Sequence, residues 1–386
     1  MKLFYFTVYD LATCQTGAKT HIEKIIEGLD RLGWEITLFS CTESLSNIKP
    51  RFDFKHICIH RRDISLVQHI RTQMRITRSL IWGRHERPEA VYIRASFANL
   101  VPVLWAVWHR IPFFYEINGA AEFSTSHRHL LPVVLSWENW VLRRAAGVIT
   151  TTQEMADHFR ARAGLSDEKF EVIPMASGCP DLAGPGGAGE IREGKRGRIG
   201  YVGSLSEHCG AETLLRSMAT VGAAYPDVTL RIVGSGPEKQ EYISLAAELG
   251  IFDKVQFFES LWGDDVLRFY NDCEILAAPY YGGFRYQRPM GSPTKIFEYL
   301  ACGRMVVTSD LPALKTFRGC PGIWFCRPDD PEDLGRVIVE ILSLPVKRRK
   351  ELGRRAQEYI KANHTWRHRI DQTSNFILQR CKGKVL

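Results

Sequence analysis

The segment from Met290 to Leu314, MGSPTKIFEYLACGRMVVTSDLPAL, constrains the fold of this chain most, because it joins a polar loop, a helix start and a short apolar strand. Gly291, Ser292 and Pro293 predict a turn, and Thr294 can cap or begin the helix. The first backbone N–H groups of such a helix have no partner within the helix and face any negative group in front of it. The segment therefore predicts an anion site that suits a diphosphate.

Two charged residues of this predicted helix are candidate ligand contacts. Lys295 lies in the first turn, where its ammonium opposes the helix dipole and gains nothing structural from its position. Glu298 lies one turn further along the same face, where it suits a ribose hydroxyl pair. The same spacing also fits an ordinary solvated ion pair. Gly303 is expected to end the helix, and residues 305–308 are expected to form a buried strand.

The same segment resembles the signature region of the retaining family 4 glycosyltransferases, which have the GT-B fold. Glu298 matches the Glu that holds the nucleotide ribose in that family, and LACGRMVVTSD is similar to the family's continuation. The resemblance covers nearly the whole chain and is strongest in the second half. It implies an α/β protein with two doubly wound, Rossmann-like domains that face each other across a cleft, with a C-terminal helix crossing back to the first domain.

The length and composition agree with two folded domains. A chain of 386 residues is longer than a single hydrophobic core usually supports. A composition of 45% hydrophobic and 24% charged residues is typical of a folded soluble protein. The net charge of +8 is compatible with an anionic substrate, an anionic membrane or nucleic acid, and does not choose among them. Ten cysteines without a CxxC pair argue against a zinc ribbon or a dithiol redox site.

Neither a signal sequence nor a membrane span is expected. The first ten residues, MKLFYFTVYD, have the pattern of a strand and lack a long apolar core, so a cytoplasmic protein is predicted. The apolar run 97–108 is too short to cross a bilayer and contains Pro102, so it is interpreted as a helix packed under a sheet.

The first half alternates strand and helix patterns, which predicts a parallel sheet with crossover helices. Strands are expected at 3–10, 34–40, 90–96, 112–119, 146–152 and 169–177, and helices at 17–33, 99–110, 129–145 and 153–164.

The winding pattern restarts after residues 181–197, which are rich in Gly and charge and are interpreted as a linker. Strands are expected at 198–205, 228–236, 254–260 and 274–281, and helices at 212–226, 237–250, 264–273, 331–344 and 347–381. The predicted domains are 1–180, joined by 366–386, and 198–365. The resemblance places the crossover to the first domain near Trp366.

Three glycine-containing turns follow strands and let the backbone approach a phosphate. They are Gly17 with Thr16 and Ala18, Gly203 with Ser204 and Leu205, and Gly234 with Ser235, Gly236 and Pro237. Each is also explained by turn chemistry alone. The resemblance makes all three candidate donor contacts, together with Ser292 and Thr294.

The chain departs from the family pattern at three positions. Ser204 and Cys209 stand where many relatives have an Arg and a Lys that neutralise the diphosphate, and Met290 stands where many have a Glu that contacts the donor sugar. Lys295 and Arg288 are the candidate catalytic replacements, because a cation in a water-poor site stabilises charge on a leaving diphosphate. A solvated basic loop is the alternative for Arg288.

In the first half, the stretch FFYEINGAAEF is similar to the family segment in which a His often contacts the donor sugar. Asn118 stands there and can hydrogen-bond a sugar hydroxyl but cannot carry a proton. Glu116 is a candidate to assist an acceptor hydroxyl. An Asn-Gly turn with surface acids is the alternative. No metal ligand set is assigned, because the HRH at 127–129 has no carboxylate or Cys partner in sequence.

Trp137 and Trp140 precede Arg143 and Arg144, a pattern that suits insertion at an anionic lipid surface. Buried core helices have nearly the same pattern, so both interpretations stay open here.

The predicted activity is a metal-independent, retaining transfer of a sugar from a nucleoside diphosphate sugar to a carbohydrate or lipid-linked acceptor. The implied setting is polysaccharide or glycoconjugate synthesis in the cytoplasm, at the inner face of the cell membrane, with no nucleic acid partner. The alternative is a sugar-nucleotide-binding protein without transferase activity.

Overall fold

The computed structural model describes residues 1–9, 11, 17–42, 55–60, 66–83, 85–96, 99–119, 131–177, 197–282 and 291–382. Two compact units are present. The first comprises Met1–Pro174, Pro289–Gly291 and Trp366–Leu386, and the second comprises Met175–Arg288 and Ser292–Thr365. The linker predicted at 181–197 lies outside the described residues except for Gly197.

The first unit is built on a parallel sheet of seven strands in the order β3-β2-β1-β4-β5-β6-β7. Its strands are β1 (Lys2–Phe6), β2 (Glu35–Thr42), β3 (Lys55–His60), β4 (Ala90–Arg94), β5 (Phe113–Ile117), β6 (Gly147–Thr150) and β7 (Phe170–Val172). Its helices are α1 (Gly17–Arg31), α2 (Leu66–Trp82), α3 (Leu100–Trp108), α5 (Leu131–Arg144), α6 (Gln153–Ala163) and α13 (Trp366–Lys382). The chain reverses its winding direction after β3, as doubly wound sheets do.

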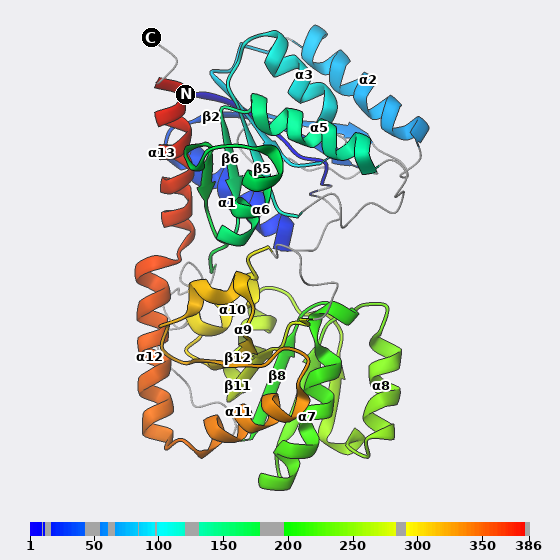
Figure 1. Cartoon of the computed structure of the whole chain (residues 1–386), viewed down its shortest axis with the longest axis vertical. Coiled ribbons are helices and arrows are strands. Elements are labelled where there is room, and N and C mark those ends of the chain that lie inside the picture. Colours follow the sequence, from blue (N-terminus) through cyan, green and yellow to red (C-terminus); the bar gives the residue numbers. More distant parts are fainter. Residues whose placement is uncertain are drawn as a thin grey trace. The chain divides into compact units, whose positions relative to one another are not determined.

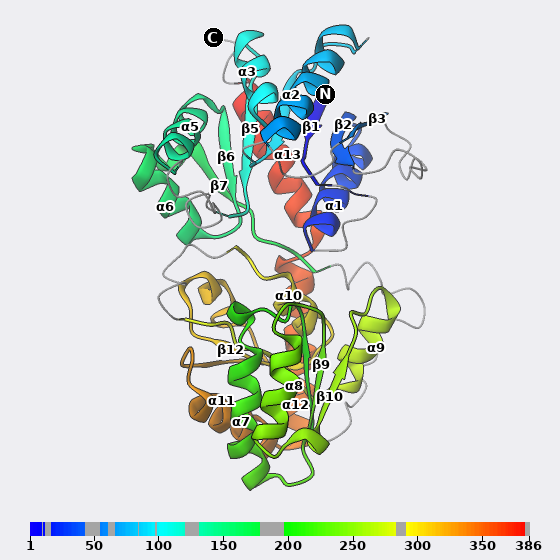
Figure 2. The ribbon, with the colours of Figure 1, turned by 90° about the vertical axis from the view of Figure 1, so that its right-hand side faces the viewer.

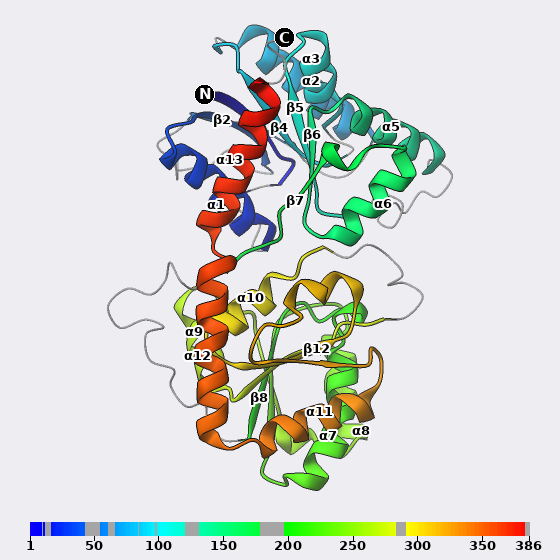
Figure 3. The same cartoon turned by 60° about the vertical axis from the view of Figure 1, so that its left-hand side comes forward.

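Alternate strand residues divide the two faces of this sheet. Phe4 and Phe6 of β1 pack with residues of α2, α3, α5 and α6 in one core cluster. The opposite face carries α1 and α13, which lie side by side (Figures 1 and 3). There the Phe114 and Phe376 rings are 5.9 Å apart, and a Cβ at Gly28 would lie 2.0 Å from Ile370 Cδ1. The predicted return of the C-terminal helix to the first domain is confirmed.

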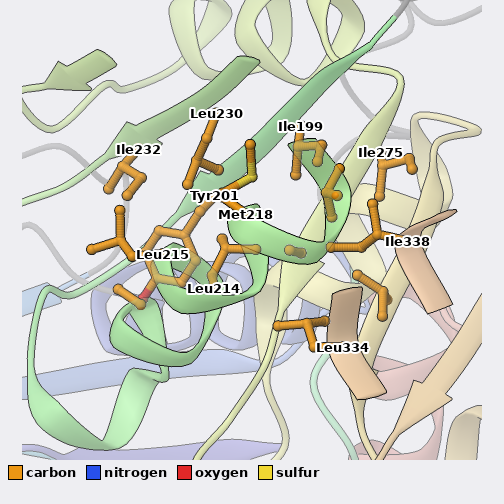
Figure 4. Close-up of a cluster of buried hydrophobic side chains, with 14 of the residues drawn as sticks. Ile199, Tyr201, Leu214, Leu215, Met218, Leu230, Ile232, Ile275, Leu334 and Ile338 are labelled. Carbon is orange, nitrogen blue, oxygen red and sulfur yellow. The ribbon is translucent and has the colours of Figure 1, made fainter. Parts of the chain in front are cut away.

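The second unit has a parallel sheet of six strands in the order β10-β9-β8-β11-β12-β13. Its strands are β8 (Arg198–Val202), β9 (Thr229–Val233), β10 (Val255–Phe258), β11 (Ile275–Ala278), β12 (Met305–Ser309) and β13 (Ile323–Cys326). Its helices are α7 (Ala211–Ala224), α8 (Lys239–Glu248), α9 (Asp264–Asp272), α10 (Thr294–Ala301), α11 (Pro331–Ser343) and α12 (Val346–Asn363), and Figure 2 shows α7 and α8 packed beside each other. Its core gathers Ile199 and Tyr201 of β8 with Leu214 and Leu215 of α7 (Figure 4).

The motif that opened the sequence analysis folds as predicted. Thr294 begins α10, with Pro293 at the N-cap, and the helix ends at Ala301. Gly303 follows with a φ of 67°, a left-handed conformation that glycine adopts without strain. The buried strand β12 comes next.

Two strands and one helix were not among the predicted elements. They are β3 and β13, which are only 6 and 4 residues long, and α2, whose apolar residues recur at helical spacing but were not assigned to an element. The predicted helix 347–381 is divided into α12 and α13, and α13 begins at Trp366, the residue predicted at the bend.

The run 97–108 forms α3 over residues 100–108, as interpreted from the sequence. In the part of the chain that the structure describes, no helix has both the length and the apolar character needed to cross a bilayer.

Candidate active site

The carboxyl ends of β8 and β9 lead into two turns that pack directly on each other. The Gly203 amide donates a hydrogen bond of 3.0 Å to the carbonyl of Val233, and the Leu205 amide donates one of 2.9 Å to the carbonyl of Ser235. A Cβ at Gly234 would lie 1.9 Å from the Gly203 carbonyl oxygen. Close backbone approach between the turns therefore explains this glycine, whatever ligand they hold.

Gly236 has the same structural explanation. A Cβ there would lie 2.1 Å from the Leu205 carbonyl oxygen. Gly203 differs, because its Cβ would lie 2.3 Å from Nζ of Lys295. The turn after β8 is thus the place that the Lys295 ammonium reaches from the second position of α10.

Lys295 is the most unusual charged group among the described residues. Its ammonium nitrogen is buried and has no hydrogen-bond partner there. It lies 4.4 Å from the ring centroid of Tyr201 and 5.2 Å from that of Tyr280, so two aromatic faces replace part of its lost hydration. An ammonium has three donor hydrogens, and aromatic faces satisfy them poorly compared with anionic oxygens. The arrangement leaves a desolvated cation ready to accept an anion.

The electrostatics of Lys295 agree with this geometry. Burial lowers its pKa to about 8, and Cys209 and Glu298 oppose that shift. An anionic ligand beside Nζ would restore the charged form.

Glu298 lies on the same helix and is held by Tyr270 of α9. The Tyr270 hydroxyl donates a hydrogen bond of 2.8 Å to Glu298 Oε2. Burial raises the pKa of Glu298, while this hydrogen bond and Lys295 oppose the rise. Next to it, the Tyr299 hydroxyl accepts from the Val202 amide at 3.0 Å, which ties α10 to the end of β8. Glu298 is therefore oriented before any ligand binds.

Ser204 and Cys209 occupy the loop between β8 and α7. The Ser204 carbonyl accepts a hydrogen bond of 2.7 Å from the Tyr201 hydroxyl, and the Ser204 hydroxyl donates to Ser206 at 3.1 Å. Cys209 is buried with its sulfur 3.5 Å from the Ser206 hydroxyl. Neither residue supplies a positive charge, whereas Lys295 Nζ reaches the turn at Gly203.

The remaining predicted donor contacts are placed as follows. Ser292 Oγ accepts a hydrogen bond of 3.2 Å from the Met175 amide, so it ties the loop before α10 to the chain after β7. Thr294 is the first residue of α10, and no side chain caps this helix. Arg288, the second predicted cation, and Met290 lie outside the described residues.

In the first unit, Glu116 is the centre of a buried network on the α1 side of the sheet. Arg94 Nη1 lies 2.7 Å and His21 Nε2 3.0 Å from Oε1, and the Tyr92 hydroxyl donates to Oε2 at 2.8 Å. Burial alone would raise the pKa of Glu116, but His21 and Arg94 hold it well below its ordinary value. Glu116 is wholly buried, and its carboxylate holds these neighbours in place. The alternative of a surface acid is therefore wrong for Glu116, and its predicted part in assisting an acceptor hydroxyl stays a prediction.

Asn118 lies two residues beyond Glu116 and is partly exposed. Its side-chain amide nitrogen donates to Glu116 Oε1, and its amide oxygen can act as an acceptor. Gly17 is exposed at the first position of α1, whereas Thr16 lies outside the described residues. The contacts predicted for Asn118 and Gly17 stay predictions.

Sequence reasoning missed the residues that position these groups. They are Tyr201, Tyr270 and Tyr280 in the second unit, and His21, Tyr92 and Arg94 in the first. The one available signal was an Arg at the end of an apolar strand, AVYIR, because a charge there needs a buried partner. Within the described ranges, no group of three or more His, Cys, Asp or Glu side chains is arranged to hold a metal ion.

Two family models match the two halves of the sequence. Residues 16–176 match the glycosyl transferase 4-like domain, and residues 196–343 match the model described as glycosyl transferases group 1. The chain belongs to the group 1 glycosyl transferases. The region matched by the second model, residues 196–343, includes α10 and therefore covers Lys295 and Glu298.

Curated relatives of this glycosyltransferase share part of their length with it. A 2-deoxystreptamine glucosyltransferase from Streptomyces kanamyceticus is 30% identical over 164 residues, which is 40% of this chain and 42% of the relative. A D-inositol 3-phosphate glycosyltransferase from Stackebrandtia nassauensis is 27% identical over 184 residues, 45% of this chain and 39% of the relative. The alignments thus span about two fifths of these relatives.

Solved structures share the fold over nearly the whole glycosyltransferase. A sucrose-phosphate synthase from Thermosynechococcus elongatus superposes with a TM-score of 0.76 at 17% identity, covering 99% of this chain and 100% of that one. HepE from Anabaena, in complex with UDP and glucose, superposes with a TM-score of 0.74 at 16% identity and covers 98% and 100%. These likenesses establish the GT-B fold.

Proposed function

We propose that this glycosyltransferase moves a sugar from a nucleoside diphosphate sugar to an acceptor hydroxyl, with retention at the anomeric carbon. The observation that carries the proposal is the buried Lys295 ammonium, which has no hydrogen-bond partner among the described residues and lies at the N-terminal turn of α10. A cation next to the first backbone N–H groups of a helix forms a site that suits a diphosphate. The UDP and UDP-glucose complexes of HepE support a donor of this class.

In the proposed reaction, the bond between the anomeric carbon and the diphosphate oxygen breaks as the acceptor oxygen bonds to that carbon. The leaving diphosphate gains negative charge, which Lys295 and the first amides of α10 stabilise more strongly in the transition state than in the ground state. The acceptor attacks on the leaving-group face, and a phosphate oxygen takes its proton. This scheme needs no protein nucleophile, and the cations take the part that a metal ion plays in other transferases.

Glu298 is proposed to bind the two ribose hydroxyls of the donor. A carboxylate has more acceptor sites than the one that Tyr270 uses at Oε2, and a ribose diol supplies two donors. Arg288, Gly17, Gly203, Ser204, Gly234, Gly236, Ser292 and Thr294 remain proposed contacts of the donor. Asn118 is proposed to accept a hydrogen bond from a sugar hydroxyl, while Glu116 keeps it oriented.

The acceptor is proposed to be a carbohydrate or a lipid-linked carbohydrate, used in polysaccharide or glycoconjugate synthesis in the cytoplasm. The family resemblance and the excess of positive charge support this setting.

The test begins with thermal-shift and calorimetric binding of UDP-, GDP-, ADP- and TDP-sugars to the full chain, followed by transfer assays over an acceptor panel with and without EDTA. We expect one nucleotide class to bind, transfer with retention by NMR of the product, and no loss of rate in EDTA. Lys295→Met and Glu298→Ala are the test variants. Lys347→Met and Glu248→Ala, which replace exposed residues of α12 and α8, are the matched controls.

Three outcomes would contradict parts of the proposal. Donor binding without transfer to any acceptor would favour the alternative of a nucleotide-sugar-binding protein. An inverted product would reject the retaining mechanism. Equal donor affinity and turnover in Lys295→Met, Glu298→Ala and their controls, with the fold intact by circular dichroism, would remove the assigned site.

A further inference from the structure

The chain that follows β11 supplies one wall of the Lys295 site. Residues 279–282, which we call the β11 extension, leave the carboxyl end of this strand, and Tyr280 among them is buried. The centroid of the Tyr280 ring lies 5.2 Å from Lys295 Nζ. A ring at this distance excludes water from an ammonium and offers it only the attraction of a π face. The position of this short segment therefore helps to decide how Lys295 is solvated.

Two hydroxyl groups of the neighbouring strand hold the start of the β11 extension. Thr308 Oγ1 donates a hydrogen bond of 2.7 Å to the carbonyl of Ala278, and Ser309 Oγ donates one of 2.5 Å to the carbonyl of Tyr280. Thr308 and Ser309 are the last two residues of β12 and are buried. Because β12 pairs with β11, its end lies where the extension leaves the sheet. The hydroxyl groups thus replace the ladder partners that the backbone has lost there.

Asp329 holds the other end of the β11 extension. The Gly282 amide donates to both carboxylate oxygens of Asp329, each at 2.9 Å. A charged acceptor makes such a bond stronger than a neutral one does. A Cβ at Gly282 would lie 2.3 Å from the Cβ of Pro328, so the two segments also pack closely. The chain after β13 therefore fixes the last residue of the extension.

The backbone of Asp329 adopts a conformation that most residues avoid. Its φ is 57°, and among the described residues other than glycine only Arg110 also has a positive φ. Asp tolerates this region better than most side chains, but the surroundings must still maintain it. The start of α11 does not explain it, because the N-cap is Asp330, whose side chain accepts from the Asp333 amide. The bond to Gly282 is the contact that this conformation provides.

We propose that Ser309 and Asp329 are positioning residues of the site for the sugar donor, because they fix the β11 extension and so hold the Tyr280 ring against the Lys295 ammonium. Neither side chain needs to touch the ligand, since each acts through the backbone. The inference rests on the proposed function for the part that Lys295 plays toward a diphosphate. The placement of Tyr280 can be tested without any ligand.

Four groups face the Lys295 ammonium. They are the Tyr201 ring from β8, the Tyr280 ring, the Cys209 thiol from the loop before α7, and the Glu298 carboxylate on α10 itself. Burial is the largest influence and lowers the pKa of Lys295 to about 8, while Cys209 and Glu298 oppose it. Of these groups, Tyr280 belongs to the β11 extension. A displaced Tyr280 ring would admit water and should raise the pKa of Lys295 toward its ordinary value of 10.5.

The first test is an NMR titration of the full chain without ligand, with lysine labelled at Cε. The Lys295 signal is identified by its absence in Lys295→Met. Asp329→Gly removes the acceptor and keeps a left-handed backbone without strain, and Ser309→Ala removes the hydroxyl donor. Each should raise the pKa of Lys295 by about one unit or more. Asp329→Asn keeps an acceptor oxygen and tolerates the same φ, so its Lys295 should titrate as in wild type.

The second test is turnover in the transfer assay. Asp329→Gly and Ser309→Ala should lower kcat by about tenfold with a smaller change in KM for the sugar donor, because the cation is misplaced at the leaving group. Asp329→Asn should recover the wild-type rate. Asp227→Gly is the matched control, since Asp227 is an exposed residue in the turn before β9 of the same unit. It should change neither the rate nor the titration.

Two outcomes would overturn the proposal. One is an unchanged Lys295 titration in Asp329→Gly and in Ser309→Ala, with the fold intact by circular dichroism. The other is an equal shift in Asp329→Asn or in Asp227→Gly, which would show general loosening of the unit. If Ser309→Ala does not fold, the comparison of Asp329→Gly with Asp329→Asn decides alone. A shifted titration in a protein that binds no nucleotide sugar would leave the placement of Tyr280 standing and reject the proposed function.

Discussion

The Tyr270 hydroxyl donates a hydrogen bond of 2.8 Å to Glu298 Oε2, and this bond joins α9 to the face of α10 that carries Lys295. A carboxylate held in this way has one orientation before a ligand arrives, which lowers the entropy cost of binding. The candidate donor site is in this sense preformed on rigid helices.

Tyr270→Phe should weaken donor binding without removing the carboxylate. The variant loses one hydrogen bond that orients Glu298, and a loss of about 1 kcal/mol corresponds to about fivefold in Kd. Calorimetric titration with the bound nucleotide measures it. Glu298→Ala should cost more than Tyr270→Phe, and the reverse order would show that Glu298 does not contact the donor.

Lys295→Met should stabilise the free protein and slow the reaction. Removing a buried ammonium that has no hydrogen-bond partner among the described residues should raise the free energy of unfolding by about 1 to 3 kcal/mol. Loss of the cation at the leaving group should lower kcat by about 10² to 10³, with a smaller effect on donor affinity. Urea unfolding and steady-state kinetics measure the two effects. A destabilised variant with normal kcat would contradict both.

The affinity for a nucleoside diphosphate should fall as pH rises above about 8. The pKa of Lys295 is lowered to about 8 in the free protein, and a bound diphosphate raises it again, so binding takes up a proton above that pH. The dissociation constant should increase by up to about tenfold per pH unit from there until the pKa of the bound form is reached. Lys295→Arg keeps its charge and should show a flat profile in the same calorimetric series.

The lowered pKa of Lys295 also sets how the free energy of unfolding changes with pH. Between about 8 and the ordinary value of 10.5, the unfolded chain binds a proton that the folded chain lacks at Lys295. The contribution of this residue to the free energy of unfolding therefore rises with pH across that range. Comparing wild type with Lys295→Met by urea unfolding isolates it, and a difference that is constant with pH would contradict the lowered pKa.

Glu116→Gln should destabilise the first unit strongly. It leaves Arg94 buried without its carboxylate, which costs about 3 to 5 kcal/mol. The double variant Glu116→Gln with Arg94→Met should recover part of that loss, because it removes the uncompensated charge. Urea unfolding of the two variants measures the difference, and equal stability would show that the pair is not coupled.

The pH dependence of this network has the same sign as that of Lys295 but falls in the acid range, because the pKa of each group is lowered on folding. Glu116 has a folded-state pKa below its ordinary value, so its contribution to stability is present above that ordinary value and is lost as pH falls. The free energy of unfolding should therefore fall more steeply with decreasing pH in wild type than in the double variant.

The order of strands and helices could be predicted from the sequence, because it depends on local pattern. Apolar runs such as residues 3–6 and 305–308 form buried strands wherever they lie, and Gly303 ends α10 because its left-handed conformation is a property of the residue itself. The α10 motif likewise placed Lys295 and Glu298 on one helix. Short strands such as β13, with 4 residues, carry too little pattern to be assigned in this way.

The partners of these residues were decided only by the tertiary structure. Lys295 meets Tyr201, a residue far earlier in the chain, and no local pattern records that contact. Glu116 was a candidate acceptor base by sequence, yet the sheet buries it with Arg94. A lipid-facing and a core position were both open for Trp140, which packs partly buried against the core of the first unit. Burial sets pKa and exposure sets what a partner can contact, and both arise from packing between segments that are distant in sequence.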